Sequence, residues 1–562
     1  NKIAAIKVNP VLWTASMTGN TNNLQLVGTG YSLCPVQQLG SALLCAPVPF
    51  RCSTLEEIHV VNSTNISSFL YVSQEQRVES NYFTSKCLAE DYLVNTENVS
   101  VAKIEIGAKE YITNLPSCPV VEYDTSDFQS TVITEWHLIC ERSTLRPLFQ
   151  MIYAIGVIIG CAICGQLSDW LGRKRIIQMA LLLLITGVVA ASLVPWYTVM
   201  LCMRALTGMS TILLIFPSYT LVSEISPPNL RTSSSILPGI AYFVAMSLFG
   251  GVAYLFPVWR HLLLMFNSPL LLMIPMGLVI TESPRWLIQN GREDEGVNIL
   301  RQAASQNGVV LSASTSLLLE KLSKTSKDNK EAREKNFSEG NQNTLQMLKA
   351  GFSAPGMRTI LLVMPVLWIL KRALYVGIAL NANNFASSNP FQYITISGAM
   401  GLVALIVSTP ISLKLTRKAF TGGGLALGGI LLLLELAVPS VYWWIKWVLV
   451  MVSFCLVAGA FQINYIYGNE LFPTVFRARG FSLMNCIASA GEMGIPLVTD
   501  LIVQYYWWAP SVTFGCMGIL ASLLLLFLPE TKDRPMPETL QDVEERYKNN
   551  SLPALQKDLH PC

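Results

Sequence analysis

The sequence has little charge, little histidine and no residue pattern typical of a catalytic centre. Only 13% of its 562 residues are charged, about half the share found in soluble globular proteins. A soluble chain of this length would form several domains, and so little charge could not cover their surfaces. The net charge of +3 is too small to indicate nucleic-acid binding, and four scattered histidines do not indicate a histidine-rich metal site. We therefore expect a polytopic membrane protein that is not an enzyme and uses no cofactor or metal.

Apolar runs long enough to cross a bilayer recur along the chain. A spanning helix needs about 20 mostly apolar residues, and eleven runs qualify: 147–167, 176–195, 196–222, 236–256, 261–280, 357–380, 391–412, 419–439, 441–467, 481–503 and 507–528. A twelfth, at 24–45, is interrupted by Gln25, Pro35, Gln37 and Gln38. A polar helix spans only where its polar face meets protein or water. We interpret 24–45 as a first helix that faces a cavity; the alternative is that it belongs to an extracellular domain.

Basic residues orient the predicted helices. Lys and Arg are retained on the cytoplasmic side in short loops, so the loop Arg173-Lys174-Arg175 places the turn at 167–176 inside. Counting helices from this turn puts residues 53–143 outside and leaves both termini in the cytoplasm. The expected organisation is an N-terminal segment at 1–23, a six-helix half at 24–281, a cytoplasmic linker at 282–356, a second six-helix half at 357–528 and a cytoplasmic tail at 529–562.

The outer segment has features of an oxidising, glycosylating compartment. Four cysteines in or beside it can form two disulfides, and three pairings are open: Cys52, Cys87, Cys118 and Cys140. Three acceptor sequons for N-linked glycans fall in the same segment: Asn62, Asn65 and Asn98. Both features agree with a multi-pass protein of the cell membrane.

Motifs of the first half of the chain recur in the second half at nearly constant offsets of 246, 244 and 248 residues. The pairs are E-x-x-P-x-x-x-R at Glu224–Arg231 and Glu470–Arg477, R-K at Arg173–Lys174 and Arg417–Lys418, and a glutamate after the sixth helix of each half, Glu282 and Glu530. Two parallel six-helix repeats joined by a long cytoplasmic loop describe the organisation of a major-facilitator transporter, whose binding site lies near the membrane midplane between the halves.

The motifs resemble more narrowly the organic-ion transporter branch of the major facilitator superfamily. The loop from Gly165 through Asp169 to Lys174 is similar to that superfamily's G-x-x-x-D-R-x-G-R-K loop, with Trp170 in place of its arginine. Four motifs narrow the resemblance to the branch: Glu282-Ser-Pro-Arg-Trp-Leu287, Glu470-Leu-Phe-Pro-Thr474 with Arg477, Pro529-Glu-Thr531 and Trp136-His-Leu-Ile-Cys140. The branch carries organic cations, anions and zwitterions. The resemblance therefore implies alternating-access transport of a small organic ion, with a coupling ion or proton as a further partner; the alternative is a non-transporting, receptor-like relative.

Charged motif residues at the predicted cytoplasmic helix ends are candidates for a gate. Glu224 and Arg231 are about two turns apart, too far to pair within one helix. We expect cross-helix clusters that latch the cytoplasmic face and break when it opens; the alternative is that these charges only solvate helix ends. The candidate gate residues are Asp169, Arg173, Glu224, Arg231, Glu470 and Arg477.

The resemblance also implies a substrate site on four helices. The resemblance places a charge-selecting position at Ser489 in this site. It also places five further residues there: Tyr242, Trp368, Tyr375, Phe461 and Gln462. Aromatic faces suit cations and flat organic ions, at about 0.5–2 kcal/mol per good cation–π contact. The alternative for each aromatic residue is helix packing.

One face of the seventh predicted helix carries residues at i, i+3, i+4 and i+7: Trp368, Lys371, Arg372 and Tyr375. Lys371 lies about 20 Å along the helix from Arg358, well inside the bilayer, where a charge is a functional candidate. Glu492, one turn beyond Ser489, is the nearest carboxylate and can pair with Lys371 or Arg372. Two bases against one acid favour an organic anion or a carboxylate-bearing zwitterion over an organic cation. The alternatives are a structural salt bridge and snorkelling of both bases to the outer surface.

Overall fold

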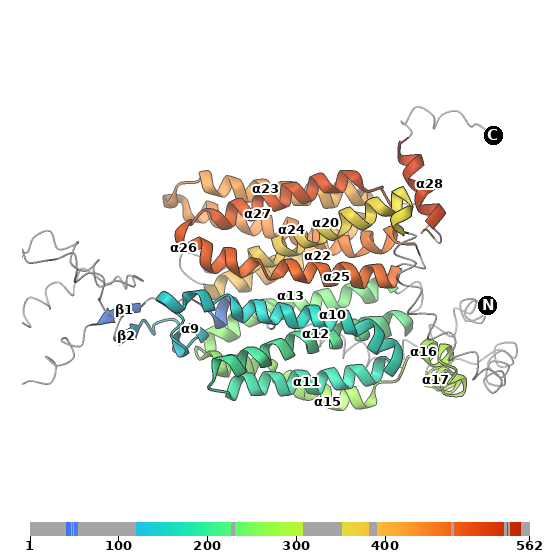
Figure 1. The fold of residues 1–562 in the computed structure, drawn as a ribbon, viewed down its shortest axis with the longest axis horizontal. Coiled ribbons are helices and arrows are strands. Elements are labelled where there is room, and N and C mark those ends of the chain that lie inside the picture. The colour runs from blue at the N-terminus through green and yellow to red at the C-terminus, as the bar shows by residue number, and fades with distance from the viewer. Residues whose placement is uncertain are drawn as a thin grey trace, which may run out of the picture.

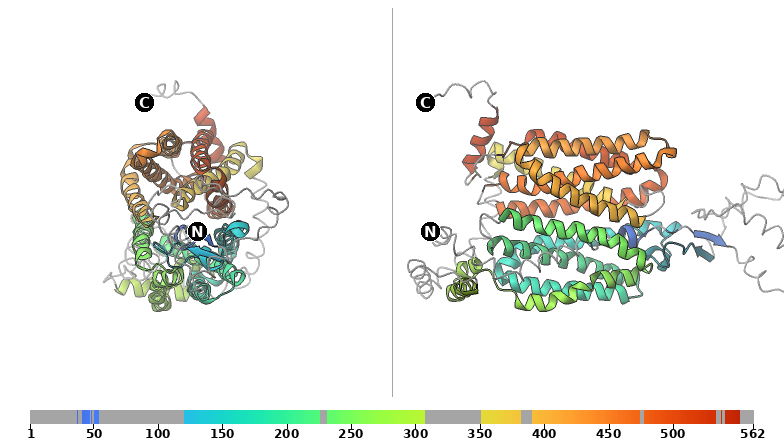
Figure 2. Two further views of the ribbon diagram at one scale, coloured as in Figure 1. Left: turned by 90° about the vertical axis from the view of Figure 1, so that its left-hand side faces the viewer. Right: turned by 180° about the vertical axis from the view of Figure 1, so that it is seen from behind.

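The computed structural model describes Gln37 and residues 41–46, 48, 50–53, 120–225, 231–306, 351–381, 390–473, 477–532, 537 and 540–551. These residues form two helical halves that lie side by side (Figure 1), with the halves seen as separate groups when the bundle is viewed along its length (Figure 2). Ten helices in the described part are long and apolar enough to cross a membrane. The predicted all-α polytopic fold is thereby confirmed.

The first half contains five membrane-crossing helices among the described residues. They are α10 (Leu148–Leu171), α11 (Arg173–Leu193), α12 (Tyr197–Ile225), α13 (Arg231–Leu255) and the pair α14 (Trp259–Asn267) and α15 (Pro269–Val279). The predicted helix at 261–280 is divided at Ser268 because Pro269 has no N–H to continue the helical ladder. Of the predicted helix at 24–45, only Gln37 and α4 (Ser41–Leu44) are described as helical.

The second half repeats this order of helices. It comprises α20 (Pro355–Leu380), α22 (Pro390–Lys414), α23 (Arg417–Ala437), η4 (Ser440–Tyr442), α24 (Trp443–Leu471), α25 (Arg477–Glu492), η5 (Leu497–Ile502), α26 (Val503–Tyr505), α27 (Ala509–Leu524) and η6 (Leu525–Phe527). The predicted helix at 481–503 is wrong as a single element. Its regular part ends at Glu492, and a turn leads into the π-helical η5, because Gly494 and Pro496 are poor residues for a helix interior.

The two ends of the bundle carry different additions (Figure 1). At one, which we call the hairpin end, are β1 (Phe50–Ser53), antiparallel to β2 (Val120–Tyr123), with α9 (Val132–Glu135) and η2 (Cys140–Leu145). At the other, which we call the tail end, are α16 (Pro284–Gln289), α17 (Glu293–Gln306) and α28 (Leu540–Ser551). Cys140 is disulfide-bonded. The side chain of Cys52 in β1 lies outside the described residues, as do Cys87, Cys118, Asn62, Asn65 and Asn98.

The motif Trp136–Cys140 attaches the hairpin-end elements to the first half. The Trp136 indole N–H donates to the carbonyl of Pro195 at 2.9 Å, and its ring packs on Tyr197 and Trp259 at centroid distances of 5.4 and 5.6 Å. Just before it, Glu135 forms an ion pair with Arg260. These contacts join α9 to α12 and α14, so the elements at the hairpin end belong structurally to the first half.

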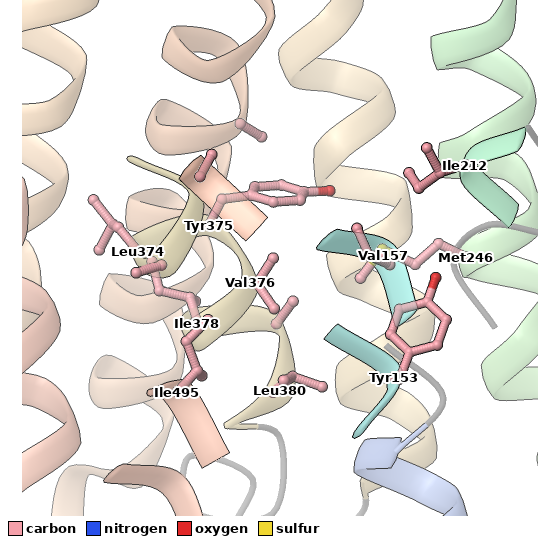
Figure 3. Packing of buried hydrophobic residues seen from close by; sticks show 14 of the residues in the cluster. Tyr153, Val157, Ile212, Met246, Leu374, Tyr375, Val376, Ile378, Leu380 and Ile495 are labelled. Atoms are coloured by element: carbon pink, nitrogen blue, oxygen red, sulfur yellow. The ribbon is translucent and has the colours of Figure 1, made fainter. Parts of the chain in front are cut away.

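The halves pack against each other through α13 with α22 and α10 with α25. Figure 3 shows part of the apolar core at this junction. Buried residues of α10, α12 and α13 face buried residues of α20 across it: Tyr153, Val157, Ile212 and Met246 on one side, Tyr375, Val376 and Leu380 on the other. Because Leu380 is the last residue of α20, this apolar junction lies in the hairpin-end part of the bundle.

Candidate functional site

Two adjacent basic residues in the middle of α20 reach two different helices. The Lys371 ammonium donates to the side-chain carbonyl Oδ1 of Asn464 on α24 at 2.7 Å. Arg372 donates through Nε to Glu492 Oε1 at the end of α25 and forms an ion pair with it. The structure therefore pairs Glu492 with Arg372, and it holds Lys371 on a neutral amide.

The charge of Lys371 is not balanced by a carboxylate of any described residue, since none lies within 4.0 Å of its ammonium. Only 1% of the Lys371 surface is exposed, and the contact with Asn464 holds the side chain inside the bundle, so it does not snorkel to an outer surface. Burying an ammonium costs several kcal/mol unless a partner offsets the lost hydration. The centre of the second half thus combines a neutralised arginine with a buried lysine that lacks a described counter-charge.

An aromatic stack lies one turn from these charges on the hairpin side. The ring of Tyr375 packs parallel to Phe461 of α24, with centroids 5.0 Å apart and an interplanar angle of 10°. Phe454, seven residues earlier on α24, stacks on the same tyrosine at 5.5 Å. Phe454 and Asn464 are absent from the sequence-based candidates, although both share the face of α24 that carries Phe461, at spacings of seven and three residues.

The remaining candidates from the sequence have other neighbours. Trp368 is buried against Gly468, where an added Cβ would approach the indole Cζ2 at 3.2 Å. Tyr242 packs edge-on against Phe243 at 5.3 Å, and Gln462 lies beside Gly239 of the first half. Ser489 donates to the carbonyl of Asn485 at 2.9 Å, and its helix α25 packs against α10 of the first half. Ser489 therefore lies at the junction of the halves.

At the tail end, each half contains an arginine–glutamate pair in the same relative position. Arg173 contacts Glu224 at 3.1 Å and Asp169 at 3.3 Å. In the second half Arg417 contacts Glu470 at 3.4 Å, and the Thr531 hydroxyl donates to the other oxygen of Glu470 at 2.6 Å. Each pair joins helices of one half. The side chains of Arg231 and Arg477 lie outside the described residues.

The motif glutamates that follow the sixth helix of each half cap another helix. Glu282 accepts backbone N–H groups of Arg173 and Lys174 at the start of α11, at 3.0 and 3.2 Å. Glu530 accepts the equivalent groups of Arg417 and Lys418 at the start of α23, at 2.9 and 3.0 Å. A helix N-terminus stabilises a carboxylate because its first N–H groups have no partner in the helix. Sequence reasoning used these glutamates as markers of the repeat and missed this capping role.

The pKa of Glu530 is lower than that of an ordinary glutamate. Partial burial acts to raise the pKa of this carboxyl, but hydrogen bonds from four backbone N–H groups outweigh it and lower the pKa. Two of these donors begin α23, and the other two follow Glu530 in the chain at 3.0 and 3.1 Å. The cap is therefore strongest when Glu530 is ionised.

Aromatic side chains join the halves at the hairpin end. The ring of Phe391, at the start of α22, lies 4.8 Å from Phe128 and 5.9 Å from Tyr254, both of the first half. One turn along α22, the carbonyl of Thr395 accepts a hydrogen bond from the Ser247 hydroxyl at 3.0 Å. We call Phe128, Tyr254 and Phe391 the aromatic latch. Sequence reasoning missed it because three isolated aromatic residues form no motif.

Arg204 of α12 is a second buried base, and its partners are neutral. Its guanidinium lies over the rings of Phe149 and Tyr153 at 4.4 and 4.9 Å, and it donates to the side-chain and backbone oxygens of Gln37 at 2.9 and 2.7 Å. Gln37 in turn donates to Asn267 at 2.8 Å. The polar position that weakened the predicted first helix is thus satisfied inside the first half. A single arginine within an apolar run was the sequence signal for this cluster.

Comparison with known proteins agrees with this architecture. The family model for sugar (and other) transporters matches residues 91–542. Solute carrier family 22 member 6 of Rattus norvegicus is 30% identical over 424 residues, which cover 75% of each chain. The chain belongs to solute carrier family 22. Within it, the organic cation transporter protein of Drosophila melanogaster is 28% identical over 514 residues, or 91% of this chain and 89% of that one.

Solved structures show the fold that this family 22 chain adopts. The inward-open xylose transporter XylE from E. coli aligns with a TM-score of 0.56 at 19% identity, covering 72% of this chain and 89% of that one. The predicted major facilitator fold and its organic-ion branch are confirmed. This member of family 22 is accordingly a membrane transporter and not an enzyme.

Proposed function

We propose that this transporter carries organic anions, or zwitterions through their carboxylate group, across the cell membrane by alternating access. The charge balance in the middle of α20 supports the anionic substrate. Glu492 already neutralises Arg372, whereas Lys371 has a neutral hydrogen-bond partner. An anion arriving beside Lys371 would supply the missing counter-charge and offset the desolvation of the ammonium.

The aromatic stack gives the proposed site a second element of recognition. Tyr375, Phe461 and Phe454 form an aromatic stack one turn from Lys371. Stacking of an aromatic ligand on a ring of this group would contribute roughly 0.5–1.5 kcal/mol beyond the area it buries. A substrate that combines a negative group with a flat apolar body would use both the charge and the rings, and we place Trp368, Tyr242, Gln462 and Ser489 around it.

We further propose that the hairpin end faces the outside of the cell and the tail end the cytoplasm. Disulfides persist in oxidising compartments, and Cys140 at the hairpin end is disulfide-bonded. The basic loop Arg173-Lys174-Arg175 begins α11 at the tail end, where the positive-inside rule expects it. Both termini then lie in the cytoplasm. The aromatic latch holds the outer side closed, so substrate would exchange with the cytoplasm in this state, with a proton or other coupling ion as a candidate partner.

Within this mechanism, we assign the tail-end charges to the inner gate. The pairs Arg173–Glu224 and Arg417–Glu470 keep the inner ends of each half in a fixed shape. A gate built from two preformed surfaces can close by docking one half on the other, without first assembling its charges. Arg231 and Arg477 are the additional basic residues that we expect to bridge the halves when the inner side closes.

The charge hypothesis is tested by comparing two neutralisations in transport assays. Lys371→Gln should abolish saturable uptake of an organic anion while surface expression is unchanged. The double variant Arg372→Gln/Glu492→Gln removes an ion pair with no change in net charge, so it is the matched control and should retain anion preference. If Lys371→Gln transports the anion like the wild type, Lys371 does not bind it. If the double variant alone loses the anion, Arg372 is the binding residue.

Transport of an organic cation is the second candidate function. The observation that favours it is the relationship to the Drosophila organic cation transporter protein, which covers more of the chain than the family 22 member 6 relatives do. On this reading Glu492 would exchange Arg372 for the substrate cation, and Tyr375 and Phe461 would bind its charge through their ring faces. Robust uptake of a quaternary cation that Glu492→Gln abolishes would establish this function.

A further inference from the structure

Helices α20 and α24 are antiparallel and meet at three successive levels. Tyr375 stacks on Phe461, Lys371 bonds Asn464, and the indole of Trp368 packs on Gly468. Passing from one level to the next moves three or four residues along each helix, which is one helical turn. The contact between Lys371 and Asn464 is therefore held in place by packed rings on both sides.

Asn464 differs from Glu492, the partner of Arg372, because its side chain is neutral. It is buried, with 1% of its surface exposed, and its Oδ1 accepts the hydrogen bond of the Lys371 ammonium at 2.7 Å. An asparagine and an aspartate have the same shape, but only the aspartate carries a charge. Asn464 thus holds the Lys371 side chain as a carboxylate would, but it brings no negative charge to it.

The neighbouring pair shows the alternative arrangement within the same turn of α20. Arg372 is held by the carboxylate of Glu492, so that pair contributes no net charge. Of the two bases, Lys371 is therefore the one whose charge, when it is protonated, has no carboxylate partner among the described residues. If position 464 carried a carboxylate, both pairs would be neutral and nothing in the centre would attract an anion.

We propose that Asn464 is the residue that determines the sign of the transported ion, by positioning the Lys371 ammonium without neutralising it. This inference rests on the proposed function, because it assumes that the substrate binds beside Lys371. It adds a specificity-determining residue on α24 that acts through Lys371. The sign of the substrate's charge then depends on whether position 464 is an asparagine or an aspartate, two side chains of the same shape.

The test is the ratio of anion to cation uptake in a series of variants with matched shape. Purified protein in liposomes is supplied with benzenesulfonate, a permanent anion, and phenyltrimethylammonium, a permanent cation of similar size. Asn464→Asp should lower the anion-to-cation ratio at least about tenfold, since neutralising a buried charge costs well over the 1.4 kcal/mol that corresponds to tenfold. Asn464→Gln keeps a neutral acceptor and should keep the wild-type preference with a changed KM. The double variant Asn464→Asp/Lys371→Gln leaves a single negative charge and should prefer the cation.

The outcomes distinguish a failure of the role proposed for Asn464 from a failure of the proposed anion transport. If the wild type takes up no anion, the proposed function is wrong. If the wild type takes up the anion and Asn464→Asp keeps its ratio, the proposed function stands and the inference is overturned. Loss of preference in Asn464→Gln equal to that in Asn464→Asp would also overturn it, because geometry and not charge would then matter. A variant that fails to fold transports neither ion, and the double variant then decides: a cation preference supports the inference and an anion preference refutes it.

Discussion

Removing the central ring of the aromatic latch should shift the transporter toward a state that is open at the hairpin end. Phe391 packs on Phe128 and Tyr254 of the other half, and Phe391→Ala deletes both contacts. Because both cross the junction of the halves, they stabilise the state closed at the hairpin end and are lost when that end opens. The substitution therefore acts on the equilibrium between the two states.

The size of the shift follows from the two ring pairs. An aromatic pair is worth about 0.5–1.5 kcal/mol beyond its buried area, so two pairs contribute about 1–3 kcal/mol. A difference of that size changes an equilibrium by about 5- to 150-fold. The hydrogen bond from Ser247 to Thr395 does not involve the Phe391 ring, so it remains in the variant.

The shift can be measured with a cysteine reporter in the apolar junction. Leu380 is buried at the hairpin end of α20 (Figure 3), and Leu380→Cys should react slowly with a membrane-impermeant thiol reagent added on the hairpin side. Adding Phe391→Ala should raise the labelling rate about 5- to 150-fold. Phe527→Ala is the control, because that ring is exposed on the outer surface of the bundle. An unchanged rate with Phe391→Ala, or an equal rise with the control, would refute the role of the latch.

Three further predictions concern the tail end and the outer segment. Glu470→Gln should lower the turnover of transport more than substrate affinity. Asp169→Asn should have little effect on turnover, because the Asp169 side chain is 75% exposed and an exposed ion pair contributes under about 1 kcal/mol. Equal losses of turnover in the two variants would contradict this. Because the pKa of Glu530 is lowered in the folded protein, its cap stabilises the fold at neutral pH, and this stabilisation is lost as the pH falls through that pKa. Glu530→Gln should therefore flatten the acid side of a plot of melting temperature against pH. An unchanged acid side would contradict the capping role. Changing all three sequon asparagines to Gln, Asn62, Asn65 and Asn98, should abolish the shift in gel mobility that glycosidase causes in the wild type. A shift that persists in the triple variant would contradict the predicted topology.

Helix positions and the repeat were predictable because they depend on local composition and spacing. Apolar runs predicted most of the membrane helices to within a few residues, and the recurrence of Arg173 and Glu224 as Arg417 and Glu470 indicated two equivalent halves. The break after Glu492 was also readable, because Gly494 and Pro496 stand inside the predicted helix at 481–503. The apolar composition of 481–503 nevertheless favoured a single continuous helix over a break at these two residues.

The partners of the site residues could not be predicted, because they depend on how helices distant in the sequence are placed. Lys371 and Arg372 are consecutive, so they project about 100° apart around α20, and periodicity alone does not say which neighbour each one meets. The structure brings α24 to one and α25 to the other. For the same reason the capping role of Glu282 was not visible in a motif that lies 109 residues from Arg173.

The sign of the transported ion is the most direct test of the central claim. Initial rates of uptake of benzenesulfonate and phenyltrimethylammonium by the wild-type protein, reconstituted alone in liposomes, measure it without any substitution. Lys371, without a carboxylate partner and beside an aromatic stack, predicts saturable uptake of the sulfonate that exceeds uptake of the quaternary cation. Saturable uptake of the cation with none of the anion would contradict the account.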